Sequence, residues 1–327
     1  MPEEALALTA LPTIDEVTAA QEQVYRVMSP TPQIVWPLLC ERLGTEVWVK
    51  HENHTPIGAF KARTAVVYAA ELFRRERGIT GLVTATRGNH GQSVALAARR
   101  FGVAAHIVVP SGNSPEKNAA MRAQGGHLIE FGDDYQAAKE HAKDLAHEHG
   151  WHFVPSYHRD IVKGVATYWL EFFSAVPNLA VVYVPIGQGS GICSCAAVRN
   201  GLNLKTKIIG VVAEGAPAYA LSFAAGRKIA APVTTLLADG MACRVPDEES
   251  LAGVLQNVDH IVQVSEKEIG EAMKICFTDT HNVAEGAGAA GLAAALKEKQ
   301  ALAGKRAGLV ITGGNVDRDV LARVLRD

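Results

Sequence analysis

Short strand-like runs alternate with helix-like stretches over most of the chain, and this alternation restricts the fold more than any other feature. The first series predicts three strands, each followed by a helix: Gly81–Ala85 and Gln92–Arg100, His106–Pro110 and Glu116–Gln124, His127–Phe131 and Tyr135–His149. Strands that alternate with helices in this way pair in parallel, and the helices cover both faces of the sheet. We therefore predict an α/β fold.

A second series of strands follows Pro155. It comprises Val181–Val184, Lys207–Val212, Ile261–Val264 and Gly308–Thr312. A capping box at residues 265–268 starts one helix, and the Ala/Gly-rich run at residues 287–296 predicts another. A chain of 327 residues with 48% hydrophobic residues can bury a large core. We predict two lobes, one made of residues 1–75 and 156–327 and the other of residues 76–155.

The segment before these series is predicted to contain one helix and one strand. Thr13–Met28 has apolar residues at helical spacing, and Glu46–Lys50 has the β-branched and aromatic residues that suit a strand. Between them, Pro30, Pro32 and Pro37 predict an extended path.

Charge and composition argue against several classes of protein. The net charge is −2 and the basic residues are scattered, so we expect no nucleic-acid partner. No apolar run approaches the roughly 18 residues of a membrane helix, and the acidic start at Met1–Glu4 lacks the layout of a signal peptide. Five cysteines, an odd number without zinc-site spacing, favour a reduced, cytoplasmic protein in which they are small core residues.

Lys61 is the first candidate for chemistry. Pro56 and Gly58 break the chain after the strand at residues 46–50, and helix-forming residues begin after Phe60. Lys61 is thus predicted to lie where a strand gives way to a helix, a frequent position for functional groups in α/β proteins. Partial burial near a helix N-terminus disfavours the ammonium form and makes the amine a better nucleophile.

Three loops at predicted strand ends could bind a ligand. Residues 84–92 include the run Thr86-Arg87-Gly88-Asn89-His90, whose backbone N–H groups and side chains could hold a carboxylate. The glycine-rich run Gly187-Gln188-Gly189-Ser190-Gly191 could hold a phosphate at a helix N-terminus. Thr312 begins the run Thr-Gly-Gly-Asn at the end of the last strand. Each loop taken alone could be a simple turn.

In combination and in this order, these motifs resemble the serine/threonine dehydratase family. The motifs are the Gly-x-Phe-Lys-x-Arg run at residues 58–63, Gly-Asn-His at residues 88–90, the glycine loop and the Thr-Gly-Gly-Asn run at residues 312–315. That family belongs to the fold type II pyridoxal-phosphate enzymes of the tryptophan-synthase-β-like group. The resemblance covers nearly the whole chain from about Thr13. It implies two domains, each an open, mostly parallel, twisted sheet flanked by helices.

The resemblance also implies a role for each motif. Lys61 would hold pyridoxal 5′-phosphate covalently and then act as the base at Cα. Phe60 would flank the ring, Asn89 would hydrogen-bond its 3′ oxygen, and Thr312 would face the pyridine nitrogen. Residues 187–191 would hold the phosphate, and Thr86, Gly88, Asn89 and His90 would hold the substrate carboxylate. Residues 76–155 would then form a small mobile domain that carries this last loop.

Arg87 is the most informative departure from the family pattern. In related racemases a serine here reprotonates the opposite face of the substrate, and an arginine is a poor proton donor near neutral pH. Arg87 either pairs with a polar or acidic substrate side chain or braces its loop. The family also usually has serine at the position of Ala59 and glycine at that of Thr64.

A divalent cation is a second point of departure. Glu214 and the Ala218 carbonyl match two family ligands, but Ala220 stands in place of the third, an aspartate, so we expect no tight metal site. Asp239 and Gly240 resemble a family segment that faces the substrate, and Glu285 resembles a residue near the cofactor.

These features predict a cytoplasmic lyase, a homodimer by resemblance, that removes water from L-threonine or L-serine and yields a 2-oxo acid and ammonia. Dehydratases of 3-hydroxyaspartate or phenylserine, a β-replacement enzyme, a racemase and a non-enzymatic cofactor carrier remain alternatives. A nicotinamide dehydrogenase lacks its ordered fingerprint here. By analogy with the family, we expect no allosteric feedback domain after Asp327 and hence a catabolic role.

Overall fold

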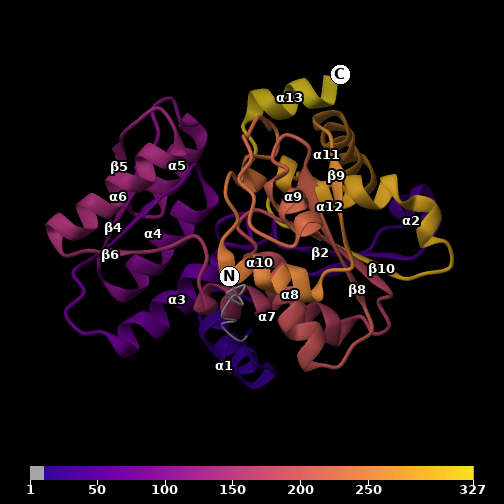
Figure 1. Cartoon of the computed structure of the whole chain (residues 1–327), viewed down its shortest axis with the longest axis horizontal. Helices are drawn as coiled ribbons and strands as arrows, with labels where there is room; N and C mark the ends of the chain where they lie inside the picture. The colour runs from indigo at the N-terminus through magenta and orange to yellow at the C-terminus, as the bar shows by residue number, and fades with distance from the viewer. Residues whose placement is uncertain (1–10, 327) are drawn as a thin grey trace, which may run out of the picture.

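Two separate sheets organise the chain in the computed structural model, which describes residues 11–326 (Figure 1). The larger sheet has the strand order β1-β2-β10-β7-β8-β9, and every neighbouring pair is parallel except β1 and β2. The smaller sheet has the order β5-β4-β3-β6 and is parallel throughout. The strands are β1 (Gln33–Val35), β2 (Val47–His51), β3 (Gly81–Ala85), β4 (Ala104–Val109), β5 (Gly126–Glu130), β6 (His152–Phe153), β7 (Val181–Pro185), β8 (Lys207–Ala213), β9 (His260–Val264) and β10 (Ala307–Ile311).

Helices cover both faces of each sheet, as the alternation of strands and helices predicted. They are α1 (Ile14–Tyr25), α2 (Pro37–Leu43), α3 (Ala62–Arg75), α4 (Asn89–Phe101), α5 (Pro115–Ala123), α6 (Tyr135–His149), α7 (Arg159–Ala175), α8 (Ser190–Gly201), α9 (Ala218–Ala225), α10 (Glu248–Asn257), α11 (Glu266–Thr280), α12 (Gly286–Lys297) and α13 (Arg318–Arg326). Two short 3₁₀ turns, η1 (Asp239–Met241) and η2 (Lys299–Leu302), complete the list for the described residues.

Successive residues of one strand enter different hydrophobic cores. In β3, Leu82 packs with α4 residues such as Val94, whereas Val83 packs with α6 residues such as Ala138. Side chains alternate across a strand, so such a strand needs apolar residues at every position. All five residues of β3 are buried, which explains the unbroken apolar composition of this run.

All four strands of the smaller sheet come from residues 81–153, which lie within the predicted lobe at 76–155. In Figure 1 this sheet and its helices α4, α5 and α6 lie to the left of the larger sheet. The predicted domain boundaries and the mobility of the smaller lobe remain predictions.

The extended path predicted before residue 46 is wrong at Pro37. This residue is the first of helix α2, which runs to Leu43. Proline is well tolerated at the first helical position, because its missing N–H would have no intrahelical acceptor there and its φ angle suits a helix. The residues before it, Gln33–Val35, form the antiparallel edge strand β1.

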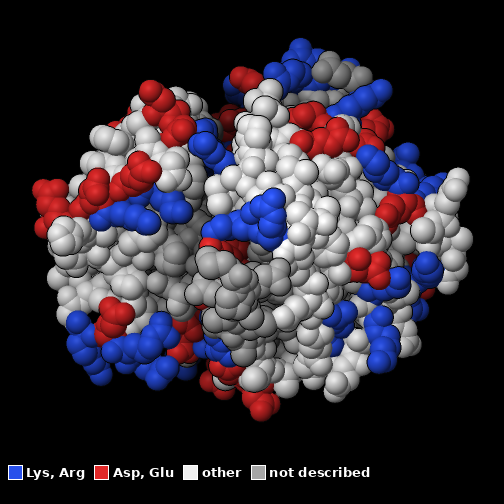
Figure 2. All heavy atoms as spheres, in the orientation of Figure 1, with Lys and Arg blue, Asp and Glu red and all other residues white. Residues whose placement is uncertain are grey.

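The mixed surface charge agrees with the sequence, and so does the burial of every cysteine except Cys40, which is only partly buried. Lysine and arginine are interspersed with aspartate and glutamate on the visible face in Figure 2. All five cysteines are unpaired, and four of them are buried. Among residues 11–326, no helix has the length and apolar character needed to cross a membrane.

Candidate active site

A cavity of about 200 Å³ lies between the two sheets and collects the residues that the sequence singled out. It is bordered by the carboxyl ends of β3, β7 and β10, where ligands gather in open α/β folds. Every predicted cofactor or substrate residue lines it, although the roles assigned to them remain predictions. They are Phe60, Lys61, Thr86, Arg87, Gly88, Asn89, His90, Gly187, Gln188, Gly189, Ser190, Gly191, Asp239, Gly240 and Thr312.

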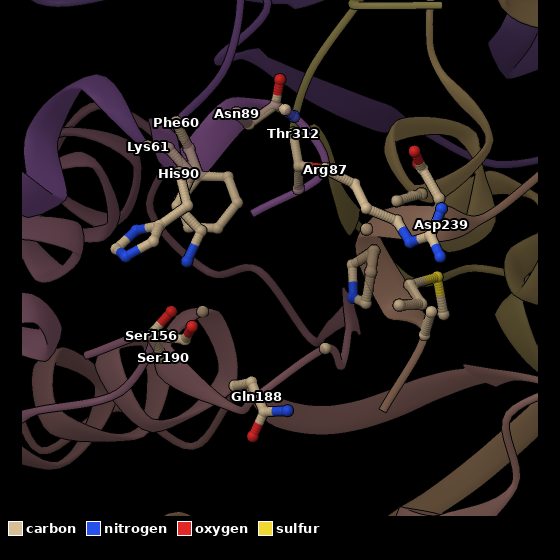
Figure 3. Close-up of a pocket in the computed structure, with 18 of the residues that line it drawn as sticks. Phe60, Lys61, Arg87, Asn89, His90, Ser156, Gln188, Ser190, Asp239 and Thr312 are labelled. Atoms are coloured by element: carbon tan, nitrogen blue, oxygen red, sulfur yellow. The ribbon is translucent and has the colours of Figure 1, made fainter. Parts of the chain in front are cut away.

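Lys61 immediately precedes helix α3, and its side chain is directed into the cavity (Figure 3). The surrounding protein removes water from the ammonium group and lowers the pKa of Lys61 to about 8. Its Nζ lies 5.1 Å from the centroid of the Phe60 ring. The Lys61 carbonyl accepts hydrogen bonds from the hydroxyls of Ser93 and Thr64, so the backbone at this residue is held from two sides.

A buried ion network anchors the beginning of α3. Arg63 Nε donates to Glu52 at 2.8 Å, and its Nη1 donates to Glu171 at 2.6 Å. Lys50 Nζ donates to the same Glu171 at 2.6 Å, so two cations face two carboxylates. Lys50, Glu52 and Arg63 are fully buried. The network ties β2, α3 and α7 together two residues from Lys61 and thereby orients the turn that carries it.

The loop after β3 is held by its own backbone and by Asn89. The Gly88 N–H donates to Thr86 Oγ1 at 3.0 Å. Asn89 Nδ2 donates to Glu285 at 2.8 Å, and Asn89 Oδ1 accepts from Asn315 at 2.7 Å. The Asn89 amide therefore links the smaller sheet to two residues beside the larger one.

His90 is buried in this wall and is neutral. Burial and the neighbouring Lys61 charge lower the pKa of His90 to about 3. Its Nδ1 is a buried polar atom without a hydrogen-bond partner in the described part of the chain. Such an atom costs free energy unless a ligand or water satisfies it.

The loop after β7 leaves no room for a side chain at two of its glycines. Gly189 has φ +93°, and a Cβ there would lie 1.6 Å from Ser250 Oγ. A Cβ on Gly187 would lie 2.5 Å from the Gly240 carbonyl oxygen. The N–H groups of residues 187–191 find no acceptor among residues 11–326, and they lie at the N-terminus of α8. Convergent free N–H groups at a helix N-terminus are suited to a phosphate.

Thr312 follows β10 on the third side of the cavity. Its carbonyl accepts a hydrogen bond from the Phe60 N–H at 2.9 Å, which fixes the chain beside Lys61. The Thr312 side chain is buried and lines the cavity. The residue at the end of this strand thus carries a neutral hydroxyl rather than a carboxylate.

Two further ionisable residues line the cavity. Sequence reasoning missed Lys117 and found only a weak sign of Glu285. Lys117 in α5 forms an ion pair with Asp239 across the two sheets, and no motif marks it. Burial and the Asp239 charge raise the pKa of Glu285 to about 8, so this carboxyl is mostly protonated at neutral pH. Tyr135, Ser156 and Tyr168 also line the cavity and were not predicted.

The weak metal candidates lie elsewhere. Glu214 and Ala218, at the end of β8 and the beginning of α9, do not line the cavity. Glu214 lies 4.0 Å from Lys297. Within residues 11–326 no three acidic, histidine or cysteine side chains converge as a metal site would need. The absence of a tight cation site remains a prediction.

These features fit pyridoxal phosphate on grounds of chemistry. A desolvated amine can hold an aldehyde, a set of acceptor-free N–H groups can hold a phosphate, and both line one cavity. Phe60 and Thr312 line the same cavity and add an apolar face and a hydroxyl to it.

Comparisons with known proteins agree with this fit. A family model described as pyridoxal-phosphate dependent enzyme matches residues 24–313. The chain is 35% identical to an L-threonine ammonia-lyase of Thermotoga maritima over 96% of this chain and 78% of that one. It is 32% identical to an L-threo-3-hydroxyaspartate ammonia-lyase of Saccharomyces cerevisiae, over 94% of each. The structure of maize serine racemase superposes with a TM-score of 0.89 at 30% identity, covering 97% of this chain and 98% of that one. The chain therefore belongs to the pyridoxal-phosphate-dependent enzymes, as a lyase of the fold type II, serine/threonine dehydratase-like group.

Proposed function

We propose that the protein eliminates water from a β-hydroxy-α-amino acid of the threonine or serine type and releases a 2-oxo acid and ammonia. One observation carries this proposal: the desolvated Lys61 amine shares a cavity with the acceptor-free N–H groups of residues 187–191 and with the loop at residues 86–90. The ammonia-lyases among the relatives support the same reaction.

The residues of the cavity would divide the work of holding the cofactor. Lys61 Nζ would bind its aldehyde carbon, residues 187–191 its phosphate, Asn89 its ring oxygen and Thr312 its ring nitrogen. Bound pyridoxal phosphate supplies an electron sink for the pair of electrons left at Cα when a proton departs. The hydroxyl of Thr312 does not enforce a charged ring nitrogen as a carboxylate would. A moderate sink favours expulsion of a β-leaving group over transamination.

The remaining steps belong to the protein's own groups. Backbone and side chains of residues 86–90 would hold the α-carboxylate, and neutral His90 would add no charge of its own. Lys61 Nζ would take the Cα proton, and the β-hydroxyl would leave with a proton as water. The resulting enamine shifts a proton to carbon and takes up one water molecule, which yields the 2-oxo acid and ammonium.

Racemisation is the second candidate, because serine racemases are among the relatives. It needs a proton donor on the face opposite Lys61. Arg87 occupies the position where related racemases have a serine, and a guanidinium does not release a proton near neutral pH. We therefore place elimination first, with β-replacement and cofactor carriage without turnover behind it.

A substrate panel tests the proposal. The cofactor-loaded protein is given L-threonine, L-serine, L-threo-3-hydroxyaspartate and phenylserine, and release of 2-oxo acid and ammonium is followed. Equal amounts of the two products from at least one substrate are expected. Conversion of an L-amino acid to its D-form without 2-oxo acid would instead establish the racemase.

Location, assembly and motion are finer parts of the same proposal. The five unpaired cysteines favour a reducing, cytoplasmic setting. A homodimer is proposed from the resemblance and is tested by sedimentation at several concentrations. We also propose that the lobe at residues 76–155 closes on the substrate, since it carries the loop at residues 86–90.

A further inference from the structure

We propose that Arg87 selects substrates that carry a second carboxylate on Cβ, so that the preferred class is β-hydroxy-α-amino dicarboxylic acids such as 3-hydroxyaspartate. This inference rests on the proposed elimination reaction and narrows its substrate. The product would be a four-carbon 2-oxo dicarboxylic acid with ammonia, by the same loss of water and hydrolysis of the enamine.

Arg87 is placed to meet a substrate side chain. It directly follows Thr86 in the loop between β3 and α4, and it lines the cavity. Figure 3 shows its side chain extending over the cavity toward the side on which Asp239 lies. Arg87 is also exposed, so its guanidinium faces open space rather than packed protein.

Arg87 does not brace its own loop. Within residues 11–326 the structure records no hydrogen bond or ion pair that involves its guanidinium. The loop is instead held by the Gly88 N–H bond to Thr86 Oγ1 and by the Thr86 N–H, which donates to the Val108 carbonyl at 3.1 Å. Of the two roles that the sequence left open for this arginine, the structure therefore favours contact with a substrate.

Among the charged residues that line the cavity, Arg87 and Lys61 are the cations without a carboxylate partner in residues 11–326. Lys117 is matched by Asp239, and Lys61 is committed to the cofactor. Glu285 is mostly protonated at neutral pH and His90 is neutral, because burial raises the pKa of the first and lowers that of the second. A substrate α-carboxylate would have the N–H groups of Arg87, Asn89 and His90, which donate to no acceptor among residues 11–326. The guanidinium of Arg87 is thus the group available to a second carboxylate, which it can bind through two parallel hydrogen bonds.

The experiment uses two amino acids that bind but cannot lose water. L-Aspartate and L-2-aminobutyrate have the same four-carbon backbone, lack a β-hydroxyl and differ in a carboxylate against a methyl group. Their dissociation constants for the cofactor-loaded enzyme are measured from the change in its visible absorbance. We expect L-aspartate to bind about 10- to 100-fold more tightly, the range of one charge-assisted hydrogen-bonding contact.

Variants assign the difference to Arg87. Arg87→Gln should weaken L-aspartate binding by about 10- to 100-fold and leave L-2-aminobutyrate within about 2-fold. Arg100→Gln, an exposed arginine in α4 that does not line the cavity, is the matched control and should change neither constant. Equal affinity for the two amino acids overturns the inference. So does a variant that weakens both amino acids and the cofactor alike, which would assign Arg87 to the cofactor phosphate.

Turnover by the same preparations separates this inference from the proposed reaction. If 2-oxo acid forms faster from L-threonine than from 3-hydroxyaspartate and L-aspartate has no advantage, elimination stands and the inference fails. If L-aspartate is preferred but none of the β-hydroxy amino acids yields 2-oxo acid, recognition by Arg87 stands and the proposed elimination fails.

Discussion

Two loops line the cavity, and they offer different kinds of groups to a ligand. Both join the carboxyl end of a parallel strand to a helix, β3 to α4 in one case and β7 to α8 in the other. The loop after β7 offers backbone N–H groups, and its Gly187 and Gly189 lie so close to Gly240 and Ser250 that neither position could carry a side chain. The loop after β3 offers the side chains of Thr86, Arg87 and His90.

The difference indicates which loop serves a constant group and which serves a variable one. A phosphate has the same shape in every turnover, so rigid backbone donors at a helix N-terminus suit it. A substrate side chain varies between relatives, and a side chain such as Arg87 can change without disturbing the fold around it. We infer that cofactor affinity depends on the loop after β7 and substrate choice on the loop after β3.

The largest effect on turnover is expected at Lys61, which lines the cavity together with both loops. Lys61→Ala should lower turnover by at least the roughly 10²–10⁴-fold that a placed proton-transfer group contributes. It should also abolish the visible absorbance of covalently held cofactor. Lys205→Ala, which replaces an exposed lysine outside this cavity, should change neither quantity. Full activity in the Lys61 variant would exclude it as the base.

Gly189→Ala tests the rigid loop. The φ of +93° and the contact of 1.6 Å that a Cβ would make with Ser250 Oγ should together cost more than about 2 kcal/mol of unfolding free energy. Cofactor affinity should fall by about 10-fold or more, because the N–H groups of this loop would be displaced. Gly226→Ala isolates the backbone strain, since Gly226 has φ +65° with open space around it, and should cost only about 1 kcal/mol. Unchanged cofactor affinity in the Gly189 variant would argue against a phosphate at this loop.

Glu285 accepts a hydrogen bond from Asn89, and its ionisation should change how the free energy of unfolding depends on pH. Burial, and next the charge of Asp239, raise the pKa of this carboxyl from 4.5 to about 8. Between these values the folded state keeps a proton that the unfolded state has lost, so stability falls as pH rises. Glu285→Gln cannot ionise and should remove up to about 1.4 kcal/mol of this fall per pH unit.

The free energy of unfolding of the cofactor-free wild type and variant is measured with denaturant at several pH values from about 5 to about 8, which lie between the ordinary pKa and the raised one. Glu22→Gln, an exposed carboxyl in α1, is the control. If the free energy of unfolding changes with pH equally in the wild type and the Glu285 variant, Glu285 is ionised in the folded protein over this whole range, which contradicts the prediction.

The smallest effect is expected at Lys117. Its ion pair with Asp239 is partly exposed, with side-chain exposures of 15% and 31%, so Lys117→Met should cost about 1 kcal/mol of unfolding free energy. Because Lys117 lies on the wall opposite the glycine loop, cofactor affinity should stay constant while KM for the amino acid rises. A loss of cofactor affinity equal to that of the Gly189 variant would remove the distinction between the two walls.

The sequence was most informative where function depends on a local pattern. Lys61 lies in the turn that leads into a helix, Gly189 and Thr312 follow strands, and all three line one cavity. Strand β3 was predicted with its observed bounds, because a short run of apolar or small residues between turns is typical of a strand that is buried on both faces.

The sequence was least informative where contacts join distant segments. Lys117 pairs with a residue 122 positions away, and nothing near it in the chain marks a binding residue. Helix α7, which carries Glu171 of the buried ion network, was not predicted at all, although it is 17 residues long. Its charged partners Lys50 and Arg63 become intelligible only when β2, α3 and α7 are brought together, because burial of one charge requires the others.

The most direct measurement is to reduce the cofactor-loaded protein with borohydride and locate the modified residue by peptide mass spectrometry. The account predicts one pyridoxyl group per chain, carried on the peptide that contains Lys61. A group attached to a different lysine, or a protein that binds the cofactor yet carries no group after reduction, would contradict it.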